Sequence, residues 1–188
     1  MEPYDVLSTD DGMAEIIEKH GKIEIPVADD AFERFVTAVV NQQLSSHSAQ
    51  AIRERLFQNF TVTPRGMIDA DEEKLREIGL SRQKVEYIGN ISERFIEKEY
   101  GDGYFEGMTN REVTDELTSI HGVGTWTSKM YLIFVLGRED VFPVEDLGIR
   151  NAMTDIYGLE NRTEMSEKAE EWSPYRSYAS LYLWRRVD

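Results

Sequence analysis

Apolar side chains recur at three- and four-residue spacing along most of this chain, the pattern of helices with one buried face. In residues 30–41 the shared face follows Asp29 or Asp30, either of which can cap the helix. It comprises Phe32, Phe35, Val36, Val39 and Val40. Similar patterns predict helices over residues 45–56, 69–79, 81–101, 109–120, 125–137, 146–158, 163–172 and 173–186.

Strand patterns are weak by comparison. Residues 21–28 alternate only briefly, and residues 140–144 contain a proline. We therefore expect an all-α protein of roughly nine or ten helices. With 188 residues, 40% of them hydrophobic, the chain can bury a substantial core in one domain or in two lobes that share a cleft.

Composition excludes several kinds of site. The chain has no cysteine, which rules out disulfides, thiolate zinc sites, cysteine nucleophiles and cysteine-ligated iron–sulfur clusters. Its histidines, His20, His47 and His121, do not have the spacing of metal ligands. No apolar run approaches the roughly 20 residues that span a membrane, and the N-terminus is acidic. We expect a soluble, cytoplasmic protein.

The charge balance is strongly acidic, with 36 acids against 21 bases and a net charge of −15. Such a surface repels nucleic acid at long range, so a DNA-binding patch would have to be local. An excess of acids with few lysines also fits a cytoplasm of molar salt, where the Debye length is about 3 Å. An ordinary acidic protein is the alternative.

Residues 117–130 carry the strongest chemical signal. A helix ends near Ile120, the turn His121-Gly122-Val123-Gly124 follows, and a second helix starts near Thr125. Glycines permit close backbone approach, so the amides of residues 122–126 can bind a phosphate at the helix N-terminus. Lys129 would add a positive charge nearby. A plain Gly-x-Gly connector between helices is the alternative.

The segment "LTSIHGVGTWTSKMYLIFVLGREDVFPVEDLGIR" resembles the signature of the helix–hairpin–helix DNA glycosylase superfamily. Within that superfamily the chain is most similar to the 3-methyladenine DNA glycosylase II branch. The resemblance extends to "VVNQQLSSHSAQAIRERL", "GLSRQKVEYIGNISERF" and "WSPYRSYASLYLWRR", and so covers most of residues 31–188.

This resemblance implies one domain over residues 1–188 with two lobes and the active-site cleft between them. A six-helix barrel would occupy residues of about 42–137, and a second lobe would combine about 1–41 with 138–188. The extra N-terminal β domain of longer members is not expected. In the superfamily, hairpin carbonyls commonly hold an alkali ion, which implies a Na⁺ or K⁺ at Ile120 and Val123 and no other cofactor.

Carried over residue by residue, the resemblance makes Asp146 the catalytic aspartate, twenty residues after Trp126. Bifunctional members have a nucleophilic lysine where this chain has Trp126. Without an amine there, a Schiff base with the sugar is not expected. Lys129 lies three residues on, about 300° around the helix, and is expected to contact phosphate.

The implied base pocket is aromatic, which suits a cationic methylated purine. Trp126 matches one wall, Trp184 a second, and Met130 stands where some relatives have a tyrosine. Helix packing is the alternative role for Trp184. The flipped base leaves a gap that Gln42 or Gln43 would fill as a wedge. A hydrogen-bonded turn between two helices is the alternative for both glutamines.

Three charged neighbours complete the expected site. We expect Glu145 to be solvated or to cap a helix, because adjacent side chains usually diverge. Arg138 and Arg150 are expected to pair with carboxylates, with DNA contact as the second option.

The implied protein is a monomeric, monofunctional glycosylase of base excision repair. It would release methylated purines from damaged double-stranded DNA, associated with the nucleoid of a prokaryote. Three alternatives stay open. They are a same-fold glycosylase for deaminated or mismatched bases, a non-catalytic helix–hairpin–helix module that binds DNA, and a structural protein unrelated to DNA.

Overall fold

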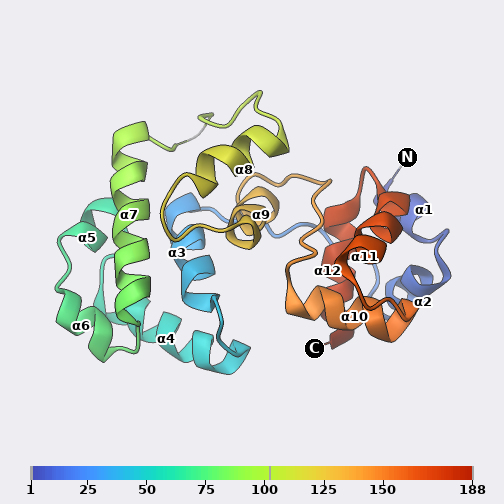
Figure 1. Cartoon of the computed structure of the whole chain (residues 1–188), viewed down its shortest axis with the longest axis horizontal. Coiled ribbons are helices and arrows are strands. Elements are labelled where there is room, and N and C mark those ends of the chain that lie inside the picture. Colours follow the sequence, from blue (N-terminus) through green and yellow to red (C-terminus); the bar gives the residue numbers. More distant parts are fainter. Residues whose placement is uncertain (1, 102, 188) are drawn as a thin grey trace. The chain divides into compact units, whose positions relative to one another are not determined.

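The computed structural model describes residues 2–101 and 103–187, and every regular element in that part of the chain is a helix. The expected all-α class is therefore confirmed (Figure 1). The chain divides into two compact units, one formed by residues 28–131 and the other by residues 1–27 together with 132–188. None of the helices in the described residues is long and apolar enough to cross a membrane.

The first unit, residues 28–131, contains seven helices in the described residues. They are α3 (Ala31–Asn41), α4 (Ser46–Asn59), α5 (Pro64–Ile68), α6 (Glu72–Glu77), α7 (Arg82–Lys98), α8 (Asn110–Thr118) and α9 (Thr125–Phe134), the last of which runs past the boundary of the unit. The long helix α7 packs against α3, α5 and α6. Aromatic rings hold this core together, since Phe35 contacts both Phe95 and Tyr131.

The second unit joins the two ends of the chain. It contains α1 (Pro3–Leu7), α2 (Asp11–His20), α10 (Leu147–Tyr157), α11 (Arg162–Ala169), the short 3₁₀ helix η1 (Glu170–Trp172) and α12 (Arg176–Val187). α12 packs against α10 and α2, and its Tyr182, which is fully buried, donates a hydrogen bond to the Gly21 carbonyl. The core of this unit also buries Trp172.

The structure has three helices that the sequence pattern did not predict: α1, α2 and α5. α1 and α5 have only five residues each, too few for a helical repeat to show. Both begin with a proline, which fits the first turn of a helix. α2 begins at an aspartate cap, Asp10, whose side chain accepts the Met13 amide.

The boundary between the units also differs from the expected lobe boundary. The sequence placed residues of about 1–41 with the second lobe, whereas α3 belongs to the unit of residues 28–131. The reason is packing, because the apolar face of α3 is buried against α4 and α7. The second boundary lies after Tyr131, six residues before the expected one.

Candidate functional site

The predicted hairpin forms, and local hydrogen bonds define it. Thr109 and Glu112 make a capping box at the start of α8. The turn is closed where the Val123 amide donates to the Ile120 carbonyl (3.0 Å), and α9 begins where the Ser128 amide donates to the Gly124 carbonyl (3.0 Å). Gly124 and Thr125 are exposed at this helix start, so first-turn amides of α9 lie at the surface.

The two glycines of the turn meet different surroundings. Gly122 has a φ of +100°, and a Cβ there would lie 2.1 Å from the Tyr87 ring of α7. A Cβ at Gly124 would meet no atom within 4 Å among the described residues. Gly122 is therefore needed by the fold, whereas Gly124 leaves open space in front of the helix start.

The alkali ion expected at the hairpin stays a prediction. The Ile120 carbonyl already accepts the Val123 amide within the turn. A carbonyl oxygen has a second lone pair, so this bond leaves room for a cation ligand.

The two candidate wedge residues lie in different environments. Gln42 is half-buried, and its side-chain amide donates to the Gly122 carbonyl (3.3 Å) and to the Thr127 hydroxyl (2.9 Å). Gln43 is exposed and has a φ of +56°, a left-handed conformation that non-glycine residues seldom adopt. The structure thus uses Gln42 to tie the α3–α4 turn to the hairpin, and it presents Gln43 at the tip of that turn.

Two basic side chains donate hydrogen bonds to the C-terminal end of α3, the helix that leads into the α3–α4 turn. The Lys84 ammonium donates to the Val40 carbonyl (2.7 Å) at the C-terminal end of α3, and Arg53 donates to the Asn41 side chain. Burial lowers the pKa of Lys84. Both contacts place positive charge where the helix dipole favours it.

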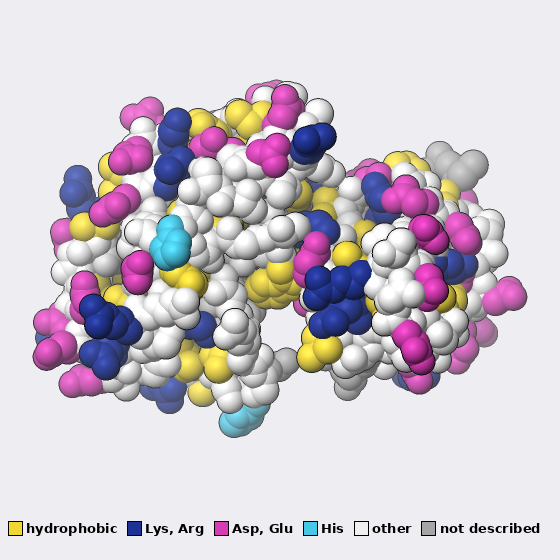
Figure 2. Space-filling view, viewed as in Figure 1, with side chains coloured by type: hydrophobic (Ala, Val, Ile, Leu, Met, Phe, Trp, Pro, Cys, Tyr) yellow, Lys and Arg dark blue, Asp and Glu magenta, His cyan; other side chains and the backbone are white. Residues whose placement is uncertain are grey.

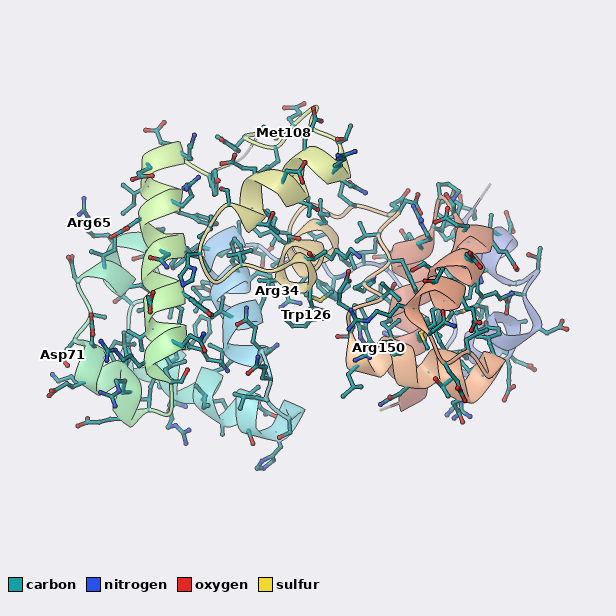
Figure 3. The ribbon with its side chains drawn as sticks, viewed as in Figure 1. Arg34, Arg65, Asp71, Met108, Trp126 and Arg150 are labelled. Carbon is teal, nitrogen blue, oxygen red and sulfur yellow. The ribbon has the colours of Figure 1, made fainter. Side chains whose placement is uncertain are left out.

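α9 carries the other candidates of this unit. Trp126 lies half-buried on its first turn (Figure 3), Lys129 is half-buried one turn on, and Met130 is buried at 5% exposure. Whether Trp126 and Met130 line a base pocket, and whether Lys129 contacts phosphate, stay predictions. Thr127, which the sequence did not single out, is buried and accepts the Gln42 amide.

Asp146, in the other unit, is the N-cap of α10. Its Oδ1 accepts the Ile149 amide (3.0 Å) and also the indole Nε1–H of Trp184 (2.9 Å). The carboxylate is half-buried, and its own amide donates to the Pro143 carbonyl (2.8 Å). Two donors on one oxygen fix the direction in which the carboxylate points.

Trp184 combines two contacts that the sequence did not distinguish. Its ring stacks on Phe134, with centroids 5.7 Å apart and planes at 30°, while its indole nitrogen holds Asp146. The expected base-wall role and the packing alternative did not include this hydrogen bond. No sequence pattern links residues 146 and 184; the packing of α10 on α12 brings them together.

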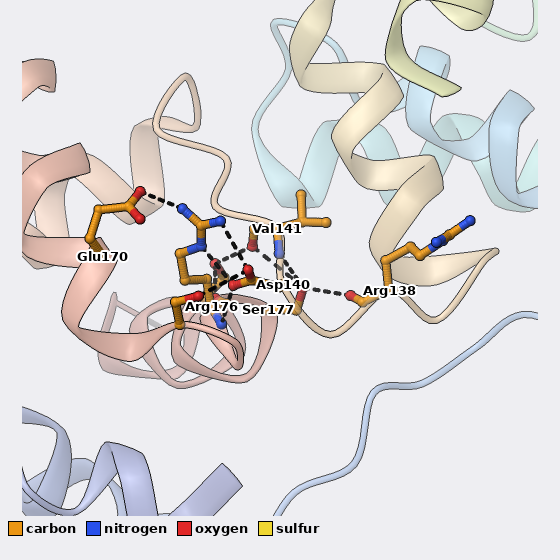
Figure 4. Close-up of polar contacts among 8 residues, drawn as sticks. Arg138, Asp140, Val141, Glu170, Arg176 and Ser177 are labelled. Carbon is orange, nitrogen blue, oxygen red and sulfur yellow. Dashed lines mark hydrogen bonds and ion pairs between the residues drawn. The ribbon is translucent and has the colours of Figure 1, made fainter. Parts of the chain in front are cut away.

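α12 also anchors the loop that leads to Asp146. The buried Ser177 hydroxyl donates to the Arg138 carbonyl (2.6 Å) and accepts the Val141 amide (3.0 Å), as Figure 4 shows. Arg176 pairs with Asp140, Nε to Oδ1 at 2.7 Å. Burial alone would raise the pKa of Asp140, but the Arg176 guanidinium outweighs it, and the pKa is lowered. α12 thus holds this loop at residues 138–141 and, through Trp184, at Asp146.

Arg150 lies on α10, one turn after Asp146 (Figure 3). Figure 2 shows a patch of Lys and Arg side chains in the region where Figure 3 labels this residue. The expectation that Arg150 pairs with a carboxylate is wrong for the described part of the chain, where its buried Nε has no hydrogen-bond partner. Arg138 and Glu145 are half-buried in the approach to α10.

Comparison with known proteins gives consistent matches. Residues 36–175 match the model of the HhH-GPD superfamily of base excision DNA repair proteins. DNA-3-methyladenine glycosylase 1 of Schizosaccharomyces pombe is 35% identical over 82% of this chain and 71% of its own length. A putative DNA-3-methyladenine glycosylase of Bacillus subtilis is 28% identical over 94% of this chain, which spans 66% of that relative's length.

The structural comparison agrees. The S. pombe 3-methyladenine DNA glycosylase, solved in complex with abasic DNA, has a TM-score of 0.90 at 30% identity. The match covers 98% of this chain and 96% of that protein.

Proposed function

Because this chain belongs to the HhH-GPD superfamily of base excision DNA repair proteins, we propose that it is a monofunctional DNA glycosylase that releases alkylated purines from double-stranded DNA. The observation that carries the proposal is Asp146 at the cap of α10, with one carboxylate oxygen held by two donors. The relatives named for 3-methyladenine support the substrate class.

The proposed chemistry needs a fixed negative charge. As the base leaves with the electrons of the glycosidic bond, the sugar gains oxocarbenium character. A carboxylate held in one orientation stabilises that charge without reorganising, and it can orient or deprotonate the attacking water. A purine methylated at N3 or N7 is already cationic, so its departure needs little acid assistance.

The absence of a lyase step rests on Trp126. A β-elimination that cuts the strand starts from a Schiff base, which needs an amine in reach of the sugar carbon. The resemblance puts Trp126 at the position of that amine. The resemblance also assigns Trp126, Met130 and Trp184 to the base pocket, and such aromatic and aliphatic side chains attract a cationic base.

The proposed DNA grip comes from the hairpin and the neighbouring turn. The Val123 amide already donates to the Ile120 carbonyl, so the expected amides left to bind a backbone phosphate are those of Gly122, Gly124 and Thr125. Lys129 would add charge, and such contacts read no base sequence. Gln43 would be the wedge, because it is the exposed glutamine at the tip of the α3–α4 turn. Gln42 would hold that turn in place.

The decisive experiment is base release from methylated duplex DNA, followed by mass spectrometry of the freed bases. The wild-type protein is expected to release 3-methyladenine and 7-methylguanine and to leave the strand uncut. Asp146→Asn is expected to lower release at least a thousandfold while still binding DNA, because the amide has no negative charge. Glu145→Gln removes the same charge one residue earlier and should keep most of the activity.

Two results would overturn these assignments. Near wild-type base release by Asp146→Asn would contradict the catalytic role of Asp146. A DNA adduct trapped by borohydride would contradict the monofunctional assignment, because it shows a Schiff base. Release of uracil or hypoxanthine in preference to methylated purines would favour a glycosylase for deaminated bases instead. Base release measured in low and in molar KCl also tests whether the acidic composition reflects a high-salt prokaryotic cytoplasm. Light scattering measures the mass in solution and so tests the expected monomer.

A further inference from the structure

Arg150 differs from the other described arginines in one respect, which is that a side-chain nitrogen is buried without a hydrogen-bond partner. Arg176 pairs with Asp140 and Glu170, and Arg186 pairs with Asp155 at 2.8 Å. Within the described residues, the Arg150 side chain makes no ion pair, and its Nε is buried without a hydrogen-bond partner.

The half-buried position of this side chain makes the missing partner informative. A guanidinium has five N–H donors, and a buried donor without an acceptor destabilises the protein. A fully exposed arginine would satisfy all of them with water. The buried Nε is closed to an outside ligand, so the groups that Arg150 can offer are its terminal Nη–H donors, which are not buried and have no acceptor among the described residues.

Its neighbours indicate where that acceptor would lie. Asp146, Leu147 and Arg150 occupy adjoining positions on the first turn of α10, because residues three and four apart share a helix face. Leu147 is 63% exposed, an unusual place for a large apolar side chain. This turn thus presents a carboxylate, an apolar side chain and a guanidinium side by side.

We propose that Arg150 binds the DNA phosphate next to the nucleotide whose base Asp146 helps to release. This inference rests on the proposed glycosylase function and adds a binding residue to it. The planar guanidinium matches two phosphate oxygens at once, which gives direction as well as charge. Leu147 would then lie against the sugar of the same nucleotide.

The contact has a physical purpose at this place. The carboxylate of Asp146 repels the phosphates that flank its target, and a guanidinium one turn away offsets that repulsion. It also fixes the sugar at the carboxylate, since a phosphate held at Arg150 positions the attached ribose.

The test is binding of a duplex that contains a tetrahydrofuran abasic-site analogue, compared with the undamaged duplex, over a range of KCl concentrations. Arg150→Met keeps the side-chain length and removes the charge. It is expected to weaken binding to the abasic-site duplex about tenfold and to lower the slope of log affinity against log salt by about 1. Binding to the undamaged duplex should fall by less than threefold.

Arg162→Met is the matched control, because it removes the same charge from an exposed position at the start of α11. It should change neither the affinity difference between the duplexes nor the slope. Arg150→Lys should retain the slope and lose part of the affinity, since ammonium binds as a point charge. If Arg150→Met has a much lower melting temperature than the wild-type protein, Arg150→Lys and Arg150→Gln replace it. Between two such variants of similar melting temperature, only Arg150→Gln should lower the salt slope on the abasic-site duplex.

The outcomes separate this inference from the function on which it rests. An unchanged slope in Arg150→Met, or equal losses on both duplexes, would overturn the phosphate contact even if the wild-type protein releases methylated purines. A reduced slope confined to the abasic-site duplex would support the contact. If the wild-type protein then released no base from alkylated DNA, that result would contradict the proposed substrate and leave the phosphate contact supported.

Discussion

At the scale of single residues, the main finding is the pair formed by Asp146 and Trp184. A tryptophan near an active site is readily taken as a wall for a flat base, and Trp184 has the stacked contact with Phe134 that suits a wall. Its indole N–H, however, also donates a hydrogen bond to the Asp146 carboxylate. We infer that Trp184 is a positioning residue for the carboxylate, in addition to the base-wall role proposed for it.

Trp184→Phe tests this role, because phenylalanine keeps an aromatic ring and loses the donor. A hydrogen bond to a charged group contributes about 1.5–3 kcal/mol. If that bond is needed in the transition state, kcat for methylated purine release falls roughly ten- to a hundredfold with little change in KM. Single-turnover kinetics at several DNA concentrations measures the two separately.

The control is the double variant, in which Trp184→Phe is introduced into the Asp146→Asn protein. With the carboxylate already removed, Trp184→Phe should cost much less, because the two residues act as one unit. A rise in KM with unchanged kcat would instead make Trp184 a wall for the base only.

At the scale of elements, the hairpin shows that one short motif meets two different demands. Gly122 and Gly124 look equivalent in the sequence "HGVG", yet Gly122 lies against Tyr87 with a positive φ and Gly124 faces open space. The first glycine lets α7 and the hairpin approach each other. The second leaves the N-terminus of α9 accessible to a ligand.

Alanine at each position should separate these demands. Gly122→Ala is expected to destabilise the protein by about 2–4 kcal/mol, because the methyl group overlaps the Tyr87 ring and alanine disfavours this φ. Gly124→Ala should change the melting temperature little but weaken binding to undamaged duplex DNA several-fold by obstructing phosphate approach. Thermal melts and DNA titrations measure both.

The reverse pattern would contradict the division of roles. If Gly124→Ala melted early, or if it bound DNA as the wild-type protein does, the open space at Gly124 would have no part in binding.

At the scale of the whole molecule, the two ends of the chain meet around a buried carboxylate. Asp10 caps α2 and is 8% exposed; its oxygens accept from Tyr157 (2.7 Å), Trp172 (3.3 Å) and Lys168 (2.7 Å). Residues more than 140 positions apart are thus linked. Burial alone would raise the pKa of Asp10, but Lys168, the Met13 amide and Tyr157 outweigh it, so the pKa is lowered.

This lowered pKa predicts a specific dependence of stability on pH. The unfolded state takes up a proton near the ordinary aspartate pKa of about 3.9, while the folded state resists it. The stabilisation is therefore complete above that pH and is lost as pH falls toward the lower, folded value. Asp10→Asn should be less stable at pH 7 by about 1–3 kcal/mol, and the gap should narrow below pH about 4.

Denaturant melts of both proteins between pH 3 and pH 7 measure that gap. Asp11→Asn is the control, since it removes an exposed carboxylate at the next position and should show a small gap. A gap for Asp10→Asn that stays constant with pH would mean that packing, and not the charge, accounts for the difference.

Much of the fold could be read from the chain. Helices α3, α4 and α6 to α12 follow from apolar spacing and capping residues, because those signals act within a few turns of one helix. The hairpin and the cap at Asp146 were likewise local, since the donors for a cap come from the next residues. The helices α1 and α5 were not predictable in this way, because five residues are too few to show a helical repeat. α2 was missed although its Asp10 cap is local, and the boundary of the first unit depends on long-range packing.

The sequence by itself determined which groups the protein has: an acid at a helix start, two glycines in a hairpin, a tryptophan where an amine could stand, and an arginine one turn after the acid. Only the tertiary structure decided how each is used. It brought the Trp184 indole to Asp146, packed Tyr87 against Gly122, and half-buried Gln42 while exposing Gln43. It also left the Arg150 Nε buried without a hydrogen-bond partner among the residues that the structure describes. The physical reason is that a hydrogen bond or a steric contact depends on distances between helices, which no local pattern records.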